Sequence, residues 1–286
     1  MPNISQILKT MAREQGVDLE IVQKDYAISY LLAAIAHTVG LGEKIVLKGG
    51  TALKKLYYPN YRFSEDLDYS TLKLGVLPNG NELLHAAVDH MADLLQEKGP
   101  FDVQVEPLTL RLPHPGEQMA YMVRVRFPDQ RQALCRLKVE ITVDEPVLLE
   151  VREHPILHGF GEKIETTISG YVLEEIVAEK LRALLQSRQK LAERGWGASR
   201  VCRDYYDLWY ILRRENLTGI PDLFAKKCQV RKVAYHSPNE LVSPDLIETA
   251  QREWDQQLSP FLSEVLNADE ALSKVQELIL ALFQDG

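Results

Sequence analysis

Three successive segments of alternating apolar residues lie in the middle of the chain and constrain its fold more than any other feature. Apolar side chains occupy every second position in residues 101–105, 119–127 and 137–143. This period of two is typical of β-strands with one buried face. Because no helical pattern separates the three segments, the strands are predicted to pair antiparallel in one sheet.

Helix and strand patterns alternate before these segments. In residues 19–38 and 81–98, apolar side chains recur with the 3.6-residue spacing of amphipathic helices. Between them, short buried strands are predicted at residues 45–47 and 67–70. A short helix is predicted to begin after Thr51, which would be its N-cap, and to run through Leu56.

After about Ser169 the pattern becomes helical throughout. Helices are predicted at residues 173–188, 203–213, 244–258 and 271–283. The chain is therefore predicted to be an α+β protein. An α+β domain with a small mixed sheet flanked by helices would span residues 1–165, and a helical domain would span residues 166–286.

Charge and hydropathy limit the class of protein. The chain has 33 Lys and Arg against 41 Asp and Glu, a formal net charge of −8, which excludes a strongly basic DNA-coating protein but not a local basic patch. The longest apolar stretch is far shorter than the roughly 20 residues of a membrane span, and the N-terminus lacks the apolar core of a signal peptide. The three cysteines form no CxxC pair and are expected to be reduced. We therefore expect a soluble, cytoplasmic protein.

A Gly-Gly pair stands where the first predicted strand passes into a helix. Gly49 and Gly50 let the backbone approach a ligand without a Cβ in the way. The N–H groups at the start of a helix lie at the positive end of its dipole, which suits an anion such as a triphosphate. The alternative is an ordinary tight turn between strand and helix.

Two aspartates, Asp66 and Asp68, are separated by one residue in the next predicted strand. Their side chains point to the same face, where the two charges repel unless a cation lies between them. Magnesium prefers one or two carboxylates together with phosphate oxygens and water. An Asp-x-Asp pair also occurs on surface strands and in glycosyltransferases. Its place after the Gly-Gly pair, with Arg62 and Ser64 just before it, favours a metal site beside a phosphate site.

A third carboxylate is predicted on a neighbouring strand. In residues 136–143, apolar side chains occupy one face, and Lys138, Glu140 and Thr142 occupy the other. Glu140 is therefore the candidate third metal ligand. The alternative is a solvent-facing residue of the strand.

Two positions in the helical half place charge against an apolar face. Lys180 lies on the apolar face of the helix over residues 173–188, where it either extends to the surface or reaches a phosphate. Asp204 and Asp207 each precede a packed residue by four positions. They form either a structural salt bridge, with Arg203 as one candidate partner, or part of a binding pocket.

Two basic runs occur in the same half. One is interleaved with Trp196 and comprises Arg188, Lys190, Arg194, Arg200 and Arg203; the other comprises Lys226, Lys227, Arg231 and Lys232. Each is either a solvated helix end or part of a surface that follows an RNA backbone.

These motifs together resemble those of the AbiEii/AbiGii family of nucleotidyltransferase toxins, which is related to the MenT toxins and, more distantly, to the DNA polymerase β superfamily. The resemblance covers most of the chain, in residues 24–26, 48–53, 62–68, 138–141, 174–183 and 203–208. It implies an enzyme that uses an NTP with Mg²⁺ or Mn²⁺. It also implies that Asp66 and Asp68 hold the metal, that Lys180 meets the triphosphate and that Asp207 completes the pocket. The family commonly has Asp where this chain has Glu140.

The resemblance further implies a biological role. The acceptor of the nucleotide would be RNA, specifically tRNA, and the outcome would be growth arrest by the toxin of a toxin–antitoxin or abortive-infection system. A cognate antitoxin would be the protein partner. Two alternatives remain: a transferase acting on a small molecule or a protein hydroxyl, and a non-catalytic nucleotide-binding or interaction module on the same scaffold.

The predicted reaction is in-line attack by an acceptor hydroxyl on the α-phosphorus of an NTP, with release of pyrophosphate. The residues predicted to bind the β- and γ-phosphates are Gly49, Gly50, Thr51, Lys55 and Lys180. Ser64 is predicted to lie at the rim of the metal site. The helical domain is predicted to complete one cleft that brings together Gly49, Gly50, Asp66, Asp68, Lys180 and Asp207.

Overall fold

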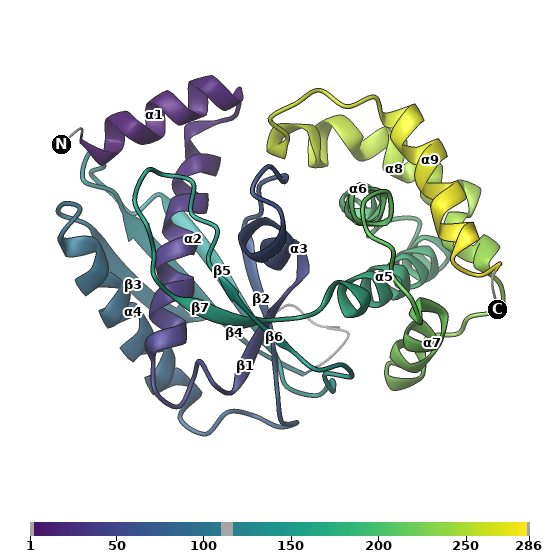
Figure 1. Cartoon of the computed structure of the whole chain (residues 1–286), viewed down its shortest axis with the longest axis horizontal. Helices are drawn as coiled ribbons and strands as arrows, with labels where there is room; N and C mark the ends of the chain where they lie inside the picture. Colours follow the sequence, from purple (N-terminus) through teal and green to yellow (C-terminus); the bar gives the residue numbers. More distant parts are fainter. Residues whose placement is uncertain (1–2, 110–116, 285–286) are drawn as a thin grey trace. The chain divides into compact units, whose positions relative to one another are not determined.

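The chain forms two compact units in the computed structural model, which describes residues 3–109 and 117–284. The first unit ends at Tyr171 and contains a β-sheet with helices; the second begins at Val172 and is helical (Figure 1). The α+β class predicted from the sequence is confirmed.

Seven strands among the described residues form one mixed sheet in the order β3-β4-β5-β2-β1-β7-β6. The strands are β1 Ile45–Lys48, β2 Asp66–Thr71, β3 Asp102–Pro107, β4 Gln118–Arg126, β5 Cys135–Thr142, β6 Arg152–Pro155 and β7 Thr167–Gly170. Strand β4 pairs antiparallel with both β3 and β5, which confirms the predicted pairing of the three alternating segments. At the centre, β2 runs antiparallel to β1 and parallel to β5.

Strands β6 and β7 lie outside the sequence predictions. Each has four residues, and β6 is mostly exposed, so neither has the repeated apolar alternation that reveals a longer strand. Strand β7 pairs in parallel with β1, and β6 forms the edge. These two strands flank the predicted domain boundary between residues 165 and 166. They extend the sheet beside β1, the strand that leads to Gly49.

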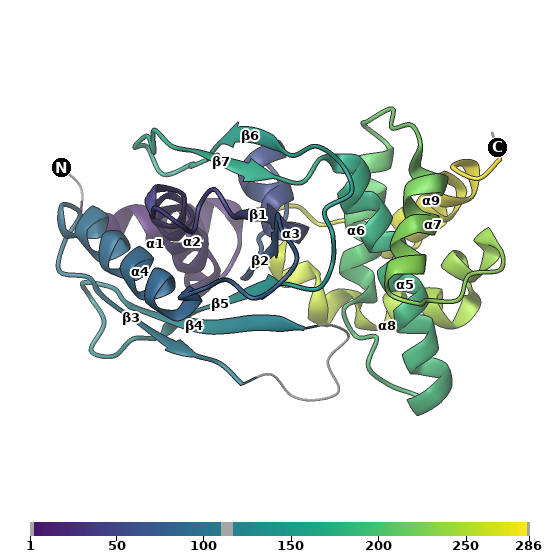
Figure 2. The ribbon, with the colours of Figure 1, turned by 90° about the horizontal axis from the view of Figure 1, so that it is seen from below.

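Helices α1 Ile4–Gln15, α2 Leu19–His37 and α4 Gly80–Gln96 complete most of the first unit. Helices α2 and α4 pack against each other; α2 contacts β5 and β7, whereas α4 contacts β3 (Figures 1 and 2). In β2, Leu67 and Tyr69 are buried, and Tyr69 shares a cavity with side chains of α2. Because side chains alternate along a strand, Asp66 and Asp68 point to the opposite face.

The connection from β1 to β2 begins with α3 Gly49–Ala52 and continues as a π-helical turn, Leu53–Tyr57. The predicted N-cap role of Thr51 is wrong, because the helix begins at Gly49 and Lys48 is the N-cap residue. The Thr51 hydroxyl instead hydrogen-bonds the carbonyl oxygen of Asp66 at the start of β2. This contact links the glycine turn to the strand that carries the aspartates.

The second unit consists of α5 Leu173–Arg194, α6 Val201–Leu212, α7 Ile220–Val230, α8 Pro244–Gln257 and α9 Ala268–Ala281, with 3₁₀ turns at Pro238–Val242 and Ser259–Phe261. Helix α6 packs against α5, α8 and α9, and α7 packs on α5. The four helices predicted from the sequence are confirmed, and α7 is an addition. Among the described residues, no helix combines the length and apolar character that crossing a membrane requires.

Lys227 corrects the interpretation of the second basic run. Its side chain is fully buried, and its Nζ lies 2.7 Å from Glu175 Oε1 and 2.9 Å from Glu179 Oε1. A buried ammonium is tolerated when carboxylates accompany it, and these two belong to α5. Lys227 therefore joins α7 to α5 and does not belong to an RNA-binding surface.

Candidate active site

The glycine turn after β1 lies in direct contact with side chains of the following strand. Gly49 has a φ of +71°, and a Cβ at this position would lie 3.0 Å from Asp68 Oδ2. A Cβ at Gly50 would lie 2.6 Å from Arg62 Nη2 and 3.3 Å from Ser64 Oγ. Position 49 therefore favours glycine for two reasons: the positive φ, and the lack of room for a Cβ beside the Asp68 carboxylate. The glycine turn and the Asp68 carboxylate therefore lie in close contact.

Gly49→Ala is expected to disrupt this contact and abolish most of the activity. The left-handed φ costs an alanine about 1–2 kcal/mol, and the new methyl group would also displace the Asp68 carboxylate. The matched control is Gly195→Ala, because Gly195 has a φ of +73° with no neighbour within 4 Å of its Cβ position. Both variants should lose similar thermal stability. Equal nucleotide-transfer rates in the two variants would show that close approach at Gly49 is unimportant.

Three carboxylates share the face of the sheet opposite α2. Asp66 and Asp68 are separated by the buried Leu67, and Glu140 of β5 lies directly beside Asp68 in the parallel register. Burial raises the pKa of Asp68 to about 6, with further contributions from the charges of Asp66 and Glu140. The face therefore carries a concentration of negative charge that a bound cation would relieve.

Two lysines lie among these carboxylates. Lys48 is opposite Asp68 in the antiparallel pair of β1 and β2, so the two side chains share a face. Lys138 is beside Asp66 in register, and its Nζ lies 2.9 Å from Glu140 Oε1. Both lysines favour ionised Asp68, but burial and the neighbouring acids outweigh them. Sequence analysis missed Lys48, although a lysine that ends a buried strand just before Gly-Gly was an available signal.

The side chains present fit a divalent cation held by two carboxylates. Within residues 3–109 and 117–284, no group of three or more His, Cys, Asp or Glu side chains is arranged to hold a metal ion. Magnesium needs only one or two carboxylates when phosphate oxygens and water complete its shell. Asp66 and Asp68 provide such a pair. Glu140 lies beside Asp68 in register, and Lys138 Nζ lies against its Oε1, so its role as a third ligand stays a prediction.

Thr51 and Ser64 lie at the edge of the glycine turn. The Thr51 hydroxyl lies 2.9 Å from Ser64 Oγ and also bonds the Asp66 carbonyl oxygen. Ser64 Oγ is in turn the atom that a side chain at Gly50 would approach. Both hydroxyls therefore stand between the turn and the start of β2, within the same group of residues as the aspartates.

Lys55 lies in a different environment. Its side chain is 1% exposed, and its Nζ lies 2.8 Å from Asp25 Oδ2 of α2. Burial lowers the pKa of Lys55, although the charge of Asp25 opposes that shift. The pair joins the π-helical turn to α2. The predicted contact of Lys55 with the phosphates gains no support, because its ammonium group is held inside the fold.

Lys180 and Asp207 meet in the second unit. Lys180 Nζ lies 2.5 Å from Asp207 Oδ2 and 2.9 Å from Asp204 Oδ1. The Asp207 side chain is fully buried, and that of Lys180 is 11% exposed. Two carboxylates of α6 thus fix the direction of the Lys180 side chain. The sequence placed both residues in one predicted cleft but did not predict the ion pair between them.

The structure therefore brings together two sets of the predicted residues. The first unit joins Gly49, Gly50, Thr51, Ser64, Asp66, Asp68 and Glu140. The second unit joins Lys180 with Asp207. That the two sets form one cleft stays a prediction.

Comparison with known proteins gives a family match. A family model described as "Nucleotidyl transferase AbiEii toxin, Type IV TA system" matches residues 30–274. No sequence among the curated proteins matches the chain. Among solved structures, it is similar to MenT4, a nucleotidyltransferase toxin from Mycobacterium tuberculosis H37Rv. The TM-score is 0.57 at 21% identity, over 96% of this chain and 98% of that chain. At this identity the structural likeness shows the shared fold.

Proposed function

The chain belongs to the AbiEii family of nucleotidyl transferase toxins, and on this premise we propose that it transfers a nucleoside monophosphate from an NTP to tRNA, with Mg²⁺ as cofactor. The observation that carries the proposal is the contact between the glycine turn and the aspartate pair. A Cβ at Gly49 would lie 3.0 Å from Asp68 Oδ2. A phosphate on the turn would therefore lie beside any metal held by Asp66 and Asp68.

The glycine turn and the Ser64 hydroxyl bind the triphosphate in this proposal, and Thr51 supports them. Backbone N–H groups at Gly49 and Gly50 donate to phosphate oxygens, and no Cβ blocks their approach. Ser64 lies at the same edge and can donate a further hydrogen bond, whereas the Thr51 hydroxyl donates to the Asp66 carbonyl oxygen and holds this edge in place. Lys180 supplies a positive charge to the β- and γ-phosphates, with Asp207 and Asp204 setting its direction.

The transfer step forms one bond and breaks one. The acceptor hydroxyl oxygen bonds to the α-phosphorus, the bond between that phosphorus and the bridging oxygen of the β-phosphate breaks, and pyrophosphate leaves. The hydroxyl proton passes to solvent. Asp66 and Asp68 would hold the Mg²⁺, which when bound would lower the pKa of the hydroxyl and neutralise charge that develops on the α-phosphate. The residues of the chain supply binding and alignment, and alignment accounts for much of the rate in reactions of this kind.

The test is transfer of label from an α-labelled NTP. Purified protein is incubated with total RNA and with ATP, GTP, CTP or UTP in turn, with and without Mg²⁺ or Mn²⁺. We expect metal-dependent label in RNA of tRNA size, with a preference for one NTP. Label on protein or on a small molecule would identify another acceptor class, and its absence from every fraction would support a non-catalytic module.

The type IV toxin–antitoxin description of the family supports a protein partner as well. We propose that a cognate antitoxin limits the growth arrest that transfer to tRNA causes. Expression of the chain alone should stop growth, and the Asp68→Asn variant, described below, should not. Growth arrest by that variant at equal expression would separate toxicity from nucleotide transfer.

A further inference from the structure

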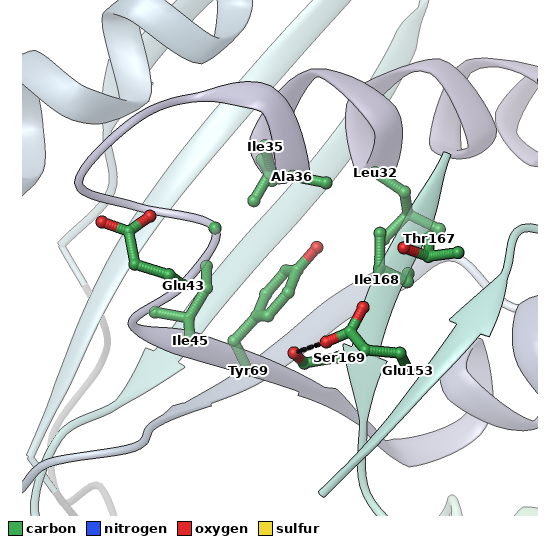
Figure 3. Close-up of a pocket in the computed structure, with 11 residues that line it drawn as sticks. Leu32, Ile35, Ala36, Glu43, Ile45, Tyr69, Glu153, Thr167, Ile168 and Ser169 are labelled. Atoms are coloured by element: carbon green, nitrogen blue, oxygen red, sulfur yellow. Dashed lines mark hydrogen bonds between the residues drawn. The ribbon is translucent and has the colours of Figure 1, made fainter. Parts of the chain in front are cut away.

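A cavity of about 310 Å³ lies on the α2 side of the sheet, on the face opposite Asp66 and Asp68 (Figure 3). Its walls combine polar groups with aliphatic side chains, among them Leu32 and Ile35 from α2 and Ile168 from β7. Strand β2 contributes Tyr69, the residue that follows Asp68. The cavity belongs entirely to the first unit and contains no residue of the candidate active site.

The Tyr69 hydroxyl points into this cavity between residues of α2 and β7 (Figure 3). Tyr69 is 4% exposed, and its hydroxyl has no hydrogen-bond partner among the residues that the structure describes. Other buried tyrosines differ: Tyr171 donates to Ser70 Oγ, and Tyr205 donates to the carbonyl oxygen of Leu241. Although the ring is buried, the hydroxyl is open to the cavity, so a polar group of a ligand there can hydrogen-bond it.

A phenol hydroxyl can both donate and accept a hydrogen bond. A ligand that enters the cavity would bury its apolar body against the aliphatic walls and satisfy this hydroxyl with one polar group.

The charges around the cavity favour one sign of ligand. Glu43 and Glu153 belong to its lining, and Glu153 accepts a hydrogen bond from Ser169 (Figure 3). Glu43 accepts a hydrogen bond from the backbone N–H of Gly40 at 2.8 Å. Lysine, arginine and histidine are absent from the described residues that line the cavity. Both carboxylates are solvent-exposed, so they attract a cation and repel an anion through a screened field.

We propose that this cavity is a second small-molecule site that binds an organic cation, namely an amine on a compact apolar body. The apolar body packs against the residues of α2 and β7. The amine hydrogen-bonds the Tyr69 hydroxyl and is attracted by the carboxylates of Glu43 and Glu153. The site is independent of nucleotide transfer, because it uses the opposite face of the sheet.

Binding of three matched probes to the full chain tests which sign of ligand charge the cavity prefers. Benzylamine, benzyl alcohol and benzoate have similar size and differ in charge. Titration followed by ligand-observed NMR should show benzylamine binding in about the millimolar range, as expected for about eight heavy atoms. Benzyl alcohol should bind more weakly and benzoate least. Equal binding of benzylamine and benzoate would overturn the proposal.

Two variants test whether Tyr69 and Glu153 contact the bound amine. Tyr69→Phe should weaken benzylamine binding about 10-fold, because it removes one hydrogen bond. Glu153→Gln should reduce the preference for the amine over the alcohol. Unchanged affinity and selectivity in both variants would place the probe elsewhere and refute the site.

Thermal melting separates this role from a structural one. Tyr69→Phe removes a hydroxyl without a protein partner, so its Tm should be unchanged or raised. Tyr205→Phe, the matched control, removes a hydroxyl that donates to the Leu241 carbonyl oxygen at 2.7 Å and should lower Tm. A loss of Tm in Tyr69→Phe as large as that in Tyr205→Phe would show that the hydroxyl serves the fold and would contradict the proposal.

Discussion

Asp68→Asn is expected to reduce nucleotide transfer by about 100-fold or more while leaving the protein folded. The substitution keeps the shape of the side chain and removes one of the two carboxylates that face the glycine turn. Transfer depends on the metal's charge at the α-phosphate, so the loss of one ligand acts directly on the transition state. The measurement is label transfer to RNA over a range of Mg²⁺ concentrations.

The same variant is expected to gain stability at neutral pH. In the folded protein, burial and the charges of Asp66 and Glu140 raise the pKa of Asp68 to about 6 from its ordinary value of 3.8. Ionised Asp68 therefore opposes folding, by on the order of 1–3 kcal/mol, and this cost develops as the pH rises from about 4 to about 6. Asp68→Asn should melt at a higher temperature than the wild type at about pH 8 without metal. The difference should vanish below about pH 4.

Two further variants serve as comparisons. Asp66→Asn should lose transfer to a similar extent, because Asp66 shares the face of Asp68. Asp89→Asn changes an exposed carboxylate on α4 and should leave transfer at the wild-type rate. Undiminished transfer by folded Asp68→Asn protein would remove the proposed metal site from the mechanism.

Lys180→Ala is expected to affect both NTP binding and stability. If Lys180 contacts the triphosphate, its loss should raise the KM for the NTP about 10- to 100-fold, the range for a hydrogen bond to a charged group. It also takes away the ammonium group that lies 2.5 Å from the fully buried Asp207. Removing one partner of a buried ion pair costs about 3–5 kcal/mol, so the melting temperature should fall markedly.

Kinetics and melting on matched variants separate the two effects. Lys180→Arg keeps a positive charge beside Asp207 and should retain more stability, yet it should still bind the NTP less well because its planar guanidinium has a different geometry. Lys190→Ala, on the same helix and partly exposed, should change neither property. A Lys180→Ala variant with lowered Tm but an unchanged KM would assign Lys180 to the fold alone.

The sequence by itself determined the elements and the faces of the central strands. Alternation of apolar residues predicted β3, β4, β5 and their antiparallel pairing, because a strand buried on one face must repeat every two residues. The same periodicity placed Asp66 and Asp68 on one face and Glu140 on the polar face of β5. It failed for β6 and β7, which are too short for a pattern to emerge; β6 is also mostly exposed.

Only the tertiary structure decided which charged groups meet. Lys55 follows the glycine turn closely in sequence, yet its buried ammonium group pairs with Asp25 of α2. Lys227 belongs to a basic run in the sequence, yet it is buried in ion pairs with two carboxylates of α5. Lys180 forms ion pairs with two aspartates of α6. Periodicity predicts which face of its helix or strand a residue occupies. It does not predict ion pairs, because their partners are distant in the sequence and become neighbours only when the core packs.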